Sequence, residues 1–350
     1  MKATQKKITF VTNHLYGGGS ERVLVTLANK FSELGFDVSI IAFNAKKRYP
    51  INENIMVTEI GDSTSLLKQS SRIRRFIKQL KPNTIVSFEY FVNLATIIAA
   101  RNTKAKVIIS ERNDPKRVGA GFGKDQLRNW LYKHCDILVC QTPDAKAYFP
   151  EVIQHHTIVI PNPIKEGLPD PYKGPRKHTV VNFCRLNEQK NLKLLIDAFA
   201  EFHKKFSDYN LIIYGDGPEK EKVEQYIFFR NLNDAVSLKP NTSNVHKLVS
   251  DCSMFVSSSD YEGLSNSMLE AMAIGLPTIC TDCPCGGARM IIQNGVNGLL
   301  VPVNNQQEMT KAMESIADNK AFAFSLSLEG TKVREVLSLI KIVAEWEKII

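Results

Sequence analysis

The stretch that decides the fold is residues 8–35, ITFVTNHLYGGGSERVLVTLANKFSELG. It opens with a short β-branched and apolar run, Ile8 to Thr12, of the kind that forms buried strands. Three glycines follow, and residues 20–34 then place apolar side chains at helical spacing before Gly35, where a helix would end. The stretch therefore predicts a strand, a glycine loop and a helix, which together are the building block of a parallel α/β sheet.

The same alternation continues along the chain. Strand-like runs separated by helical segments lie at residues 38–43, 84–88, 107–110, 137–140 and 157–160. A stretch rich in proline and glycine, residues 161–175, has no periodicity and is typical of a linker. Beyond it the alternation restarts, with runs at residues 179–183, 211–214, 254–257 and 278–281.

These patterns predict an α/β protein with two Rossmann-like domains that face each other across a crevice. We expect the first domain over residues 1–165, the second over residues 166–330, and a C-terminal helix over residues 331–350 that packs back on the body, crossing to the first domain. Ligands of open parallel sheets bind at the carboxyl ends of the strands. The loops that follow each strand are therefore where chemistry should be sought.

Composition is that of an ordinary globular protein, since 43% of the 350 residues are hydrophobic and 23% are charged. No apolar run approaches the roughly 20 residues that span a bilayer, and the polar start is unlike a signal peptide. The seven cysteines are an odd number, which fits a reducing cytoplasm. Cys280, Cys283 and Cys285 have metal-like spacing, but no second Cys or His pair follows, so a metal site is disfavoured.

Charge is unevenly spread along the chain. Residues 1–165 hold 25 Lys and Arg against 13 Asp and Glu, whereas the remaining residues hold 20 against 23. A basic half suggests contact with nucleic acid or an anionic membrane, although chance asymmetry of a solvated surface is an alternative. We favour a membrane or a lipid-pyrophosphate acceptor, which would bind to the cations of one helical segment. The alternative, that this segment is an ordinary amphipathic surface helix without a partner, explains the pattern equally well. The cations of the segment are Arg72, Arg74, Arg75, Lys78 and Lys81.

Three loops at predicted strand ends carry candidate phosphate-binding groups. The loop Gly17-Gly18-Gly19 lets the backbone approach a ligand and leads into a helix N-terminus, although a tight turn explains it equally well. Arg185 and Lys190 follow the strand at residues 179–183, where two cations can neutralise a diphosphate leaving group. Gly215 and Gly217 form a third turn, for which a purely structural role is an equal alternative.

The strongest signal is residues 260–277, DYEGLSNSMLEAMAIGLP. Glu262 lies in the loop after a strand, and Glu270 lies within the helix that follows. A carboxylate accepts two hydroxyl hydrogen bonds and so suits a ribose diol or neighbouring sugar hydroxyls. The amides of residues 264–266 open this helix towards a diphosphate. Glu270 could instead be a solvated helix residue, but its neighbours are apolar.

Together these motifs resemble glycosyltransferase family 4. The spacing of Glu262 and Glu270 is similar to the paired-glutamate motif of that family, and the remaining motifs stand in the family's order. They are GGGSER at 17–22, PNP at 161–163, Arg185-Leu186 with Lys190-Asn191, GDGP at 215–218 and NGVNGLLVP at 294–302. The resemblance covers nearly the whole chain.

The resemblance implies a GT-B fold and a retaining hexosyl-type transferase that needs neither metal nor cofactor. The second domain would bind a nucleotide diphosphate sugar and the first an acceptor. Arg185 and Lys190 would hold the diphosphate, Glu262 the donor sugar and Glu270 the ribose, with the first three as the catalytic group. Stabilisation of charge on the departing phosphate would drive the reaction without a protein nucleophile. Further donor contacts are expected at Gly17, Gly18, Gly19, Gly215, Gly217, Gly263, Leu264, Ser265 and Asn266.

The chain departs from the family pattern at two places. Glu111, Arg112 and Asn113 stand where many members carry a histidine that contacts the donor sugar, a variant that resembles the capsule and exopolysaccharide subset. We expect these three residues to contact the acceptor or the donor sugar. Arg289 stands where relatives often carry an acidic residue, which could shift donor preference.

The expected reaction moves a hexose or N-acetylhexosamine from a UDP-sugar to a saccharide or lipid-linked saccharide in cell-surface polysaccharide biosynthesis. It would take place in the cytoplasm or at the inner face of the cell membrane. One alternative is a GT-B nucleotide-sugar epimerase or hydrolase, which fold alone does not separate from a transferase. A basic nucleic-acid-binding module is a second alternative, although the chain lacks an aromatic platform or zinc-finger pattern.

Overall fold

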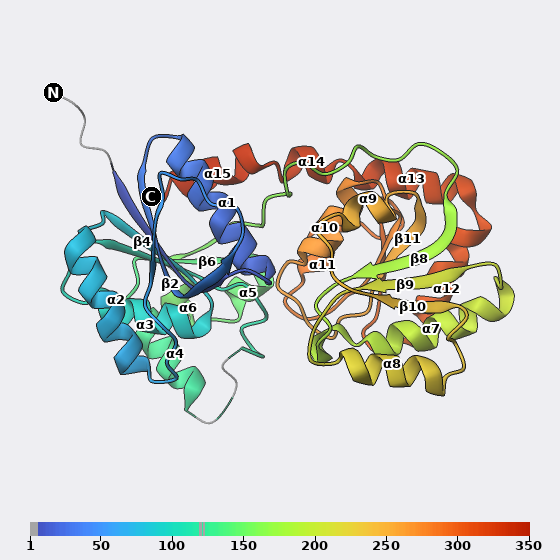
Figure 1. The fold of residues 1–350 in the computed structure, drawn as a ribbon, viewed down its shortest axis with the longest axis horizontal. Helices are drawn as coiled ribbons and strands as arrows, with labels where there is room; N and C mark the ends of the chain where they lie inside the picture. Colours follow the sequence, from blue (N-terminus) through green and yellow to red (C-terminus); the bar gives the residue numbers. More distant parts are fainter. Residues whose placement is uncertain (1–5, 119–120, 122) are drawn as a thin grey trace. The chain divides into compact units, whose positions relative to one another are not determined.

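The computed structural model describes residues 6–118, 121 and 123–350. The chain forms two compact units: unit 1 comprises Met1–Asn162 and Ile340–Ile350, and unit 2 comprises Pro163–Leu339 (Figure 1). The first boundary lies slightly before residue 165, where the sequence places it. The second lies beyond residue 330, because the short helix Val333–Val336 that follows this position packs on unit 2.

Unit 1 is built on a seven-stranded sheet with the order β3-β2-β1-β4-β5-β6-β7, in which every pairing is parallel. Its central strands are buried on both faces, which is why they are rich in Val and Ile. The strands are β1 (Lys7–Leu15), β2 (Asp37–Arg48), β3 (Met56–Glu59), β4 (Thr84–Phe88), β5 (Lys106–Ser110), β6 (Ile137–Cys140) and β7 (Thr157–Val159).

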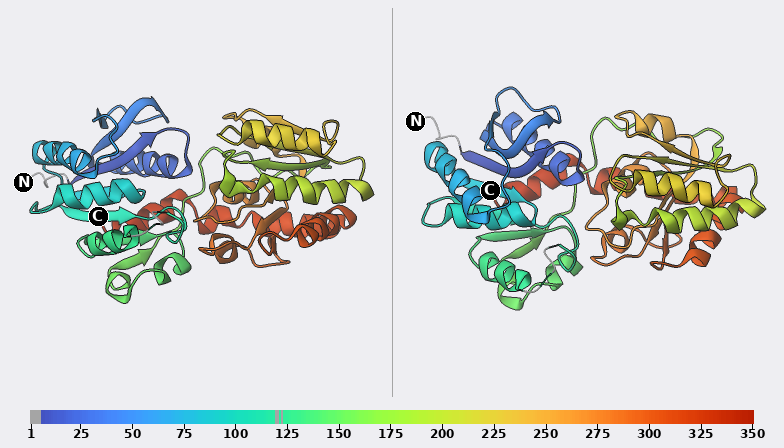
Figure 2. Two further views of the ribbon diagram at one scale, coloured as in Figure 1. Left: turned by 90° about the horizontal axis from the view of Figure 1, so that it is seen from below. Right: turned by 60° about the horizontal axis from the view of Figure 1, so that its bottom comes forward.

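Helices cover both faces of this sheet (Figure 2). They are α1 (Gly19–Glu33), α2 (Leu66–Leu80), α3 (Tyr90–Ala100), α4 (Lys124–Tyr132), α5 (Pro143–Ala147), α6 (Glu151–Gln154) and the C-terminal α15 (Leu339–Glu347). Trp346 of α15 is 1% exposed and its ring lies 5.8 Å from that of Phe88 at the end of β4. The Thr84 hydroxyl donates to the carbonyl of Ile350 over 3.2 Å. The end of the chain is therefore part of the core of unit 1.

Unit 2 is built on a six-stranded sheet with the order β10-β9-β8-β11-β12-β13, again with parallel pairing throughout. The strands are β8 (Lys177–Phe183), β9 (Asn210–Tyr214), β10 (Val236–Lys239), β11 (Cys252–Ser257), β12 (Thr278–Thr281) and β13 (Leu299–Val301). Reversal of the strand order at β8 and β11 is where open α/β sheets place their ligand sites.

Three helices of unit 2, α7 (Leu192–Lys205), α8 (Lys220–Phe229) and α12 (Gln306–Asp318), share one hydrophobic cluster with the sheet. Phe199 and Phe202 of α7 and Met313 of α12 are fully buried in this cluster. The remaining helices are α9 (Val245–Val249), α10 (Asn266–Ala273), α11 (Gly287–Ile291), α13 (Lys320–Gly330) and α14 (Val333–Val336), with the short 3-10 helix η1 (Glu188–Lys190).

Two features differ from the sequence prediction. The strands β3, β10 and β13 are not predicted, and residues 331–350 form α14 and α15 rather than one helix. All three strands lie at sheet edges, where one side faces solvent and the apolar run is short or interrupted by polar residues. Across the described residues, no helix is both long and apolar enough to span a bilayer.

Candidate functional site

Lys190 and Glu262 form an ion pair at the carboxyl edge of the unit 2 sheet. Lys190 ends η1, which follows β8, and Glu262 lies in the loop after the adjacent strand β11. The two side chains are 16% and 14% exposed. Burial, the largest single influence, opposes the charged form of Lys190, but the Glu262 carboxylate and the nearby Cys184 together raise the pKa of Lys190. A fixed positive charge therefore lies at the strand-order reversal.

Neighbouring side chains hold this pair in place. Gln189 Nε2 donates to Glu262 Oε2 over 3.2 Å and to the carbonyl of Tyr261 over 2.7 Å. The Ser259 hydroxyl donates to Glu262 Oε1 over 2.8 Å, and the Ser258 hydroxyl donates to the carbonyl of Lys190 over 2.9 Å. Sequence analysis did not single out Gln189 or Ser259, although both stand next to motifs that it did identify.

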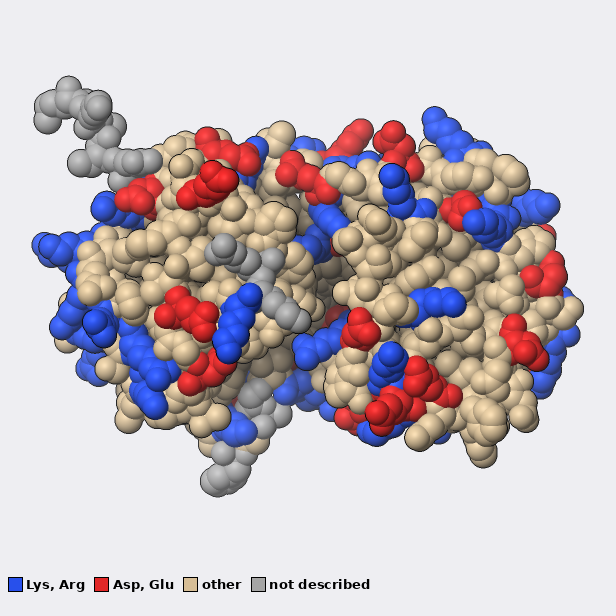
Figure 3. Space-filling model, in the orientation of Figure 1, with Lys and Arg blue, Asp and Glu red and all other residues tan. Residues whose placement is uncertain are grey.

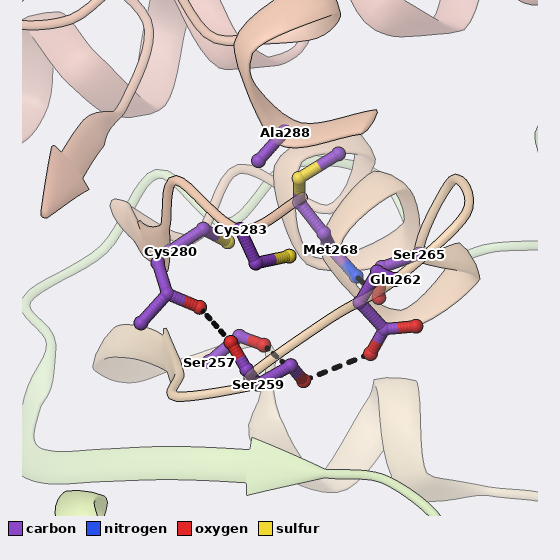
Figure 4. Close-up of a pocket in the computed structure, with 9 residues that line it drawn as sticks. Ser257, Ser259, Glu262, Ser265, Met268, Cys280, Cys283 and Ala288 are labelled. Carbon is purple, nitrogen blue, oxygen red and sulfur yellow. Dashed lines mark hydrogen bonds between the residues drawn. The ribbon is translucent and has the colours of Figure 1, made fainter. Parts of the chain in front are cut away.

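A pocket opens beside Glu262, as Figure 4 shows. Small polar, thiol and apolar side chains line it: Ser257, Ser259, Glu262, Ser265, Met268, Cys280, Thr281, Cys283 and Ala288. Ser265 caps α10 by accepting a hydrogen bond from the amide of Met268 over 3.4 Å, so the helix begins at the pocket. Burial raises the pKa of the Cys283 thiol to about 12, which keeps it protonated at neutral pH.

Glu270 lies inside α10 and is 8% exposed, so it is not a solvated helix residue. One of its carboxylate oxygens, Oε2, lies 2.6 Å from Nε2 of His246 in α9. The sequence does not predict His246 as a site residue, because His246 belongs to no motif and no local signal marks it.

The glycine turns of unit 2 allow loops to pack on one another. A Cβ at Gly215 would collide with the carbonyl of Cys184, and one at Gly217 with the carbonyl of Leu186. Arg185, which is exposed, stands between Cys184 and Leu186 in the sequence. Gly287, which no sequence motif marks as a site residue, makes the same kind of contact with the carbonyl of Gly263. These glycines therefore shape the loops that carry Arg185 and Glu262.

In unit 1 the loop Gly17-Gly18-Gly19 leads from β1 into α1. Gly17 has a φ of 79°, and a Cβ at Gly18 would collide with the carboxylate of Glu21. The hydroxyl of Ser20 lies 2.9 Å from Glu21 Oε2 and 2.7 Å from Glu89 Oε1. Burial, followed by the charge of Glu21, raises the pKa of Glu89 to about 8. The glycine loop thus borders a protonated carboxyl group.

Two family models match the chain. The model described as "Glycosyltransferase Family 4" matches residues 17–167, and the model described as "Glycosyl transferases group 1" matches residues 170–332. The chain belongs to glycosyltransferase family 4. An uncharacterized glycosyltransferase of Haemophilus influenzae is 26% identical over 99% of this chain and 100% of the relative. The chain is therefore a transferase enzyme, as its motifs predict.

A second relative is an α-1,4-N-acetyl-D-galactosaminyltransferase of Campylobacter jejuni named for a diNAcBac-PP-undecaprenol acceptor, 26% identical over 98% of each chain. Among solved structures, Anabaena HepE in complex with UDP-glucose has a TM-score of 0.83 at 17% identity, covering 98% of this chain and 100% of that chain. Sucrose-phosphate synthase of Thermosynechococcus elongatus has a TM-score of 0.85 at 16% identity, covering 99% and 98%. The predicted GT-B fold is confirmed.

In this family 4 glycosyltransferase, the residues that replace the histidine are largely internal. Glu111 is 2% exposed and accepts a hydrogen bond from the Tyr132 hydroxyl, and burial raises its pKa. Arg112 donates to the side-chain oxygen of Asn162 and lies over the ring of Phe88, 4.3 Å from its centroid. Burial lowers the pKa of Arg112 to about 9. Both side chains therefore make structural contacts within unit 1, and their contact with the acceptor or the donor sugar stays a prediction.

Asn113, the third of these residues, is half-buried, and its side-chain oxygen accepts a hydrogen bond from the amide of Asp114 over 2.8 Å. This contact within its own loop shapes the turn after β5. Its side chain therefore lies nearer to solvent than that of Glu111.

The cations of α2 fall into two groups. Arg72 donates to the carbonyl of Gly61 over 2.8 Å, and Arg74 donates to that of Ala99 over 2.9 Å. The other three are exposed, and the space-filling view shows Lys and Arg gathered over this part of unit 1 (Figure 3). We call them the exposed cations of α2, counting Lys81 at the C-terminal cap of the helix: Arg75, Lys78 and Lys81.

Proposed function

We propose that this glycosyltransferase moves a hexose or N-acetylhexosamine, with retention, from a UDP-sugar to a saccharide or lipid-linked saccharide in cell-surface polysaccharide biosynthesis. The observation that carries the proposal is the Lys190–Glu262 ion pair, in which Glu262 lies in the loop before α10 and Glu270 lies inside that helix. The UDP-glucose bound by Anabaena HepE and the undecaprenol-linked acceptor named for the Campylobacter enzyme support these substrate classes.

The donor diphosphate would bind between the two cations and the N-terminus of α10. Arg185 is exposed and can present a planar pair of donors to phosphate oxygens. An ammonium group has three N–H donors, so Lys190 can maintain its ion pair with Glu262 and still donate to a phosphate oxygen. The amides at the start of α10, from Leu264 to Asn266, add partial positive charge.

The reaction follows from this placement of charge. As the bond between the sugar and the diphosphate breaks, negative charge grows on the departing phosphate, and Arg185 and Lys190 stabilise it. The sugar becomes oxocarbenium-like, and Glu262, held by Gln189 and Ser259, accepts hydrogen bonds from its hydroxyls. We propose that no metal takes part, so transfer should continue in EDTA.

A thermal-shift screen of UDP-, GDP- and ADP-sugars tests the donor. A bound donor at 100 times its Kd adds about 2.7 kcal/mol to the stability of the unit that binds it. Incubation of the stabilising donor with water alone separates transfer from hydrolysis or epimerisation. Release of free sugar or of an epimer at the full rate without any acceptor would contradict the transferase assignment.

Glu262→Gln tests the site. It keeps the shape of the side chain but removes the charge that pairs with Lys190, and kcat should fall about a hundredfold or more. Glu201→Gln, at an exposed position of α7, is the matched control and should transfer at the wild-type rate. Transfer by Glu262→Gln at more than about a tenth of the wild-type rate would refute the role of Glu262.

For the acceptor side we propose that the exposed cations of α2 bind anionic lipid headgroups, as a lipid-linked acceptor would require. Each cation near an anionic surface contributes about 1 kcal/mol of attraction. Leu67, about two turns before Arg75 along α2, is 74% exposed and adds an apolar contact. Arg72 and Arg74 are bound to backbone carbonyls, so they contribute less to this surface.

A further inference from the structure

His246 stands outside the motifs of the family yet contacts the carboxylate proposed to bind ribose. Its Nε2 lies 2.6 Å from Glu270 Oε2, and the two residues are 7% and 8% exposed. With a proton on Nε2 the imidazole donates a hydrogen bond to this carboxylate, which in its ionised form only accepts. A hydrogen bond to a charged group, buried from water, is among the stronger ones in proteins.

The imidazole is held on its other sides. Val245 and Val249 anchor α9 in the core of unit 2. The ring of His246 meets that of Phe183 edge to face, 5.6 Å apart with 79° between the planes. Phe183 is packed in turn against Phe255, 4.9 Å away. A rotation of the imidazole would break this packing, so His246 offers Glu270 a donor in a fixed position.

We propose that His246 is a positioning residue for nucleotide binding, which fixes the Glu270 carboxylate in the orientation that accepts the ribose hydroxyls. This inference rests on the proposed function, in which Glu270 binds the ribose of the donor. A glutamate side chain that is ordered before the ligand arrives does not lose its rotamer freedom on binding. Loss of His246 therefore weakens nucleotide binding and leaves the chemical step unchanged.

The test is a thermodynamic cycle between the side chain and the ribose hydroxyls. Calorimetric titration with UDP and with 2′,3′-dideoxy-UDP gives the hydroxyl preference as a ratio of two Kd values. We expect the wild type to prefer UDP by about tenfold or more. In His246→Ala the Kd for UDP should rise about tenfold, and the ratio should shrink to about threefold or less.

Conservative and control variants separate positioning from packing. His246→Gln keeps an N–H donor and should recover much of the lost preference, whereas His246→Asn, whose amide is too short to reach Glu270, should not. Leu248→Ala, at an exposed position of the same helix, should keep the wild-type ratio. In transfer assays, His246→Asn should raise KM for the UDP-sugar with kcat unchanged. If His246→Ala does not fold, the Gln and Asn variants carry the same comparison.

Glu270→Ala distinguishes failure of this inference from failure of the proposed function. If Glu270→Ala keeps the wild-type preference for UDP, the assignment of Glu270 to ribose is overturned. If Glu270→Ala loses the preference while His246→Ala and His246→Asn keep it, only the positioning role of His246 is overturned. A fall in kcat without a change in KM in the His246 variants would also overturn it.

Discussion

Glutamine in place of Glu89 should stabilise unit 1, and the gain should grow as pH rises. Glu89 lies between β4 and α3 with a φ of 79°, a backbone region that residues other than glycine rarely adopt. Burial and the nearby charge of Glu21 raise its pKa from 4.5 to about 8. The Ser20 hydroxyl donates to Glu89 Oε1, which lowers the pKa of Glu89, but burial and the charge of Glu21 outweigh this hydrogen bond.

The sign and size of the effect follow from these two pKa values. Above pH 4.5 the unfolded chain releases the proton of Glu89, but the folded chain retains it until about pH 8. The folded state therefore binds more protons in this window, and its stability falls with rising pH. The slope is at most about 1.4 kcal/mol per pH unit, or about 4 kcal/mol from pH 5 to pH 8. Glutamine does not titrate, so Glu89→Gln removes this slope.

Both tryptophans, Trp130 and Trp346, belong to unit 1, so their fluorescence during urea unfolding reports on that unit alone. Unfolding free energies of the wild type and Glu89→Gln are compared at pH 5, 6, 7 and 8. Their difference should be smallest at pH 5 and largest at pH 8. Glu53→Gln, an exposed position in the same unit, should show no such trend. A difference between Glu89→Gln and wild type that does not change with pH would refute the reasoning.

Three further predictions concern other parts of the chain. Arg112→Ala removes the contact with Phe88 and the bond to Asn162, so the free energy of unfolding of unit 1 should fall by about 2–4 kcal/mol; a urea midpoint equal to that of the wild type would contradict this. Gly215→Ala should lower the melting temperature followed by circular dichroism and weaken UDP binding, because its Cβ meets a carbonyl; an unchanged melt would count against it. Glutamine at all three exposed cations of α2 should reduce flotation with anionic liposomes and leave transfer to soluble acceptors unchanged; equal flotation would remove the membrane contact.

The sequence predicts the central strands well and the edge strands poorly. The bounds of β4, β6 and β12 coincide with the runs at residues 84–88, 137–140 and 278–281, because strands buried on both faces are rich in apolar and β-branched residues along their whole length. The edge strands β3 and β10, MVTE and VSLK, carry polar residues because one side of each is open to solvent. Their short mixed patterns cannot be told from loops by periodicity.

The sequence also does not predict that Glu111 and Arg112 make internal contacts. Glu111 and Arg112 follow β5 at a position where loops usually meet ligands, and charged residues are usually solvated. Their partners, Tyr132 and Asn162, come from segments 21 and 50 residues away. Spacing along the chain does not reveal such partners, so a pattern that suggests a binding loop also fits a buried structural contact.

The two carboxylates of α10 and its preceding loop show how far sheet order can extend such predictions. Lys190 and Glu262 are 72 residues apart, but they follow β8 and β11, which are adjacent in the sheet of unit 2. In doubly wound sheets the loops that follow adjacent strands lie side by side. A correct prediction of the strand order is therefore enough to expect Lys190 and Glu262 to lie close together. His246 follows β10, which is separated from β11 by β9 and β8. It contacts Glu270, and its ring packs on Phe183 at the end of β8. Both contacts depend on tertiary packing that no periodic pattern encodes.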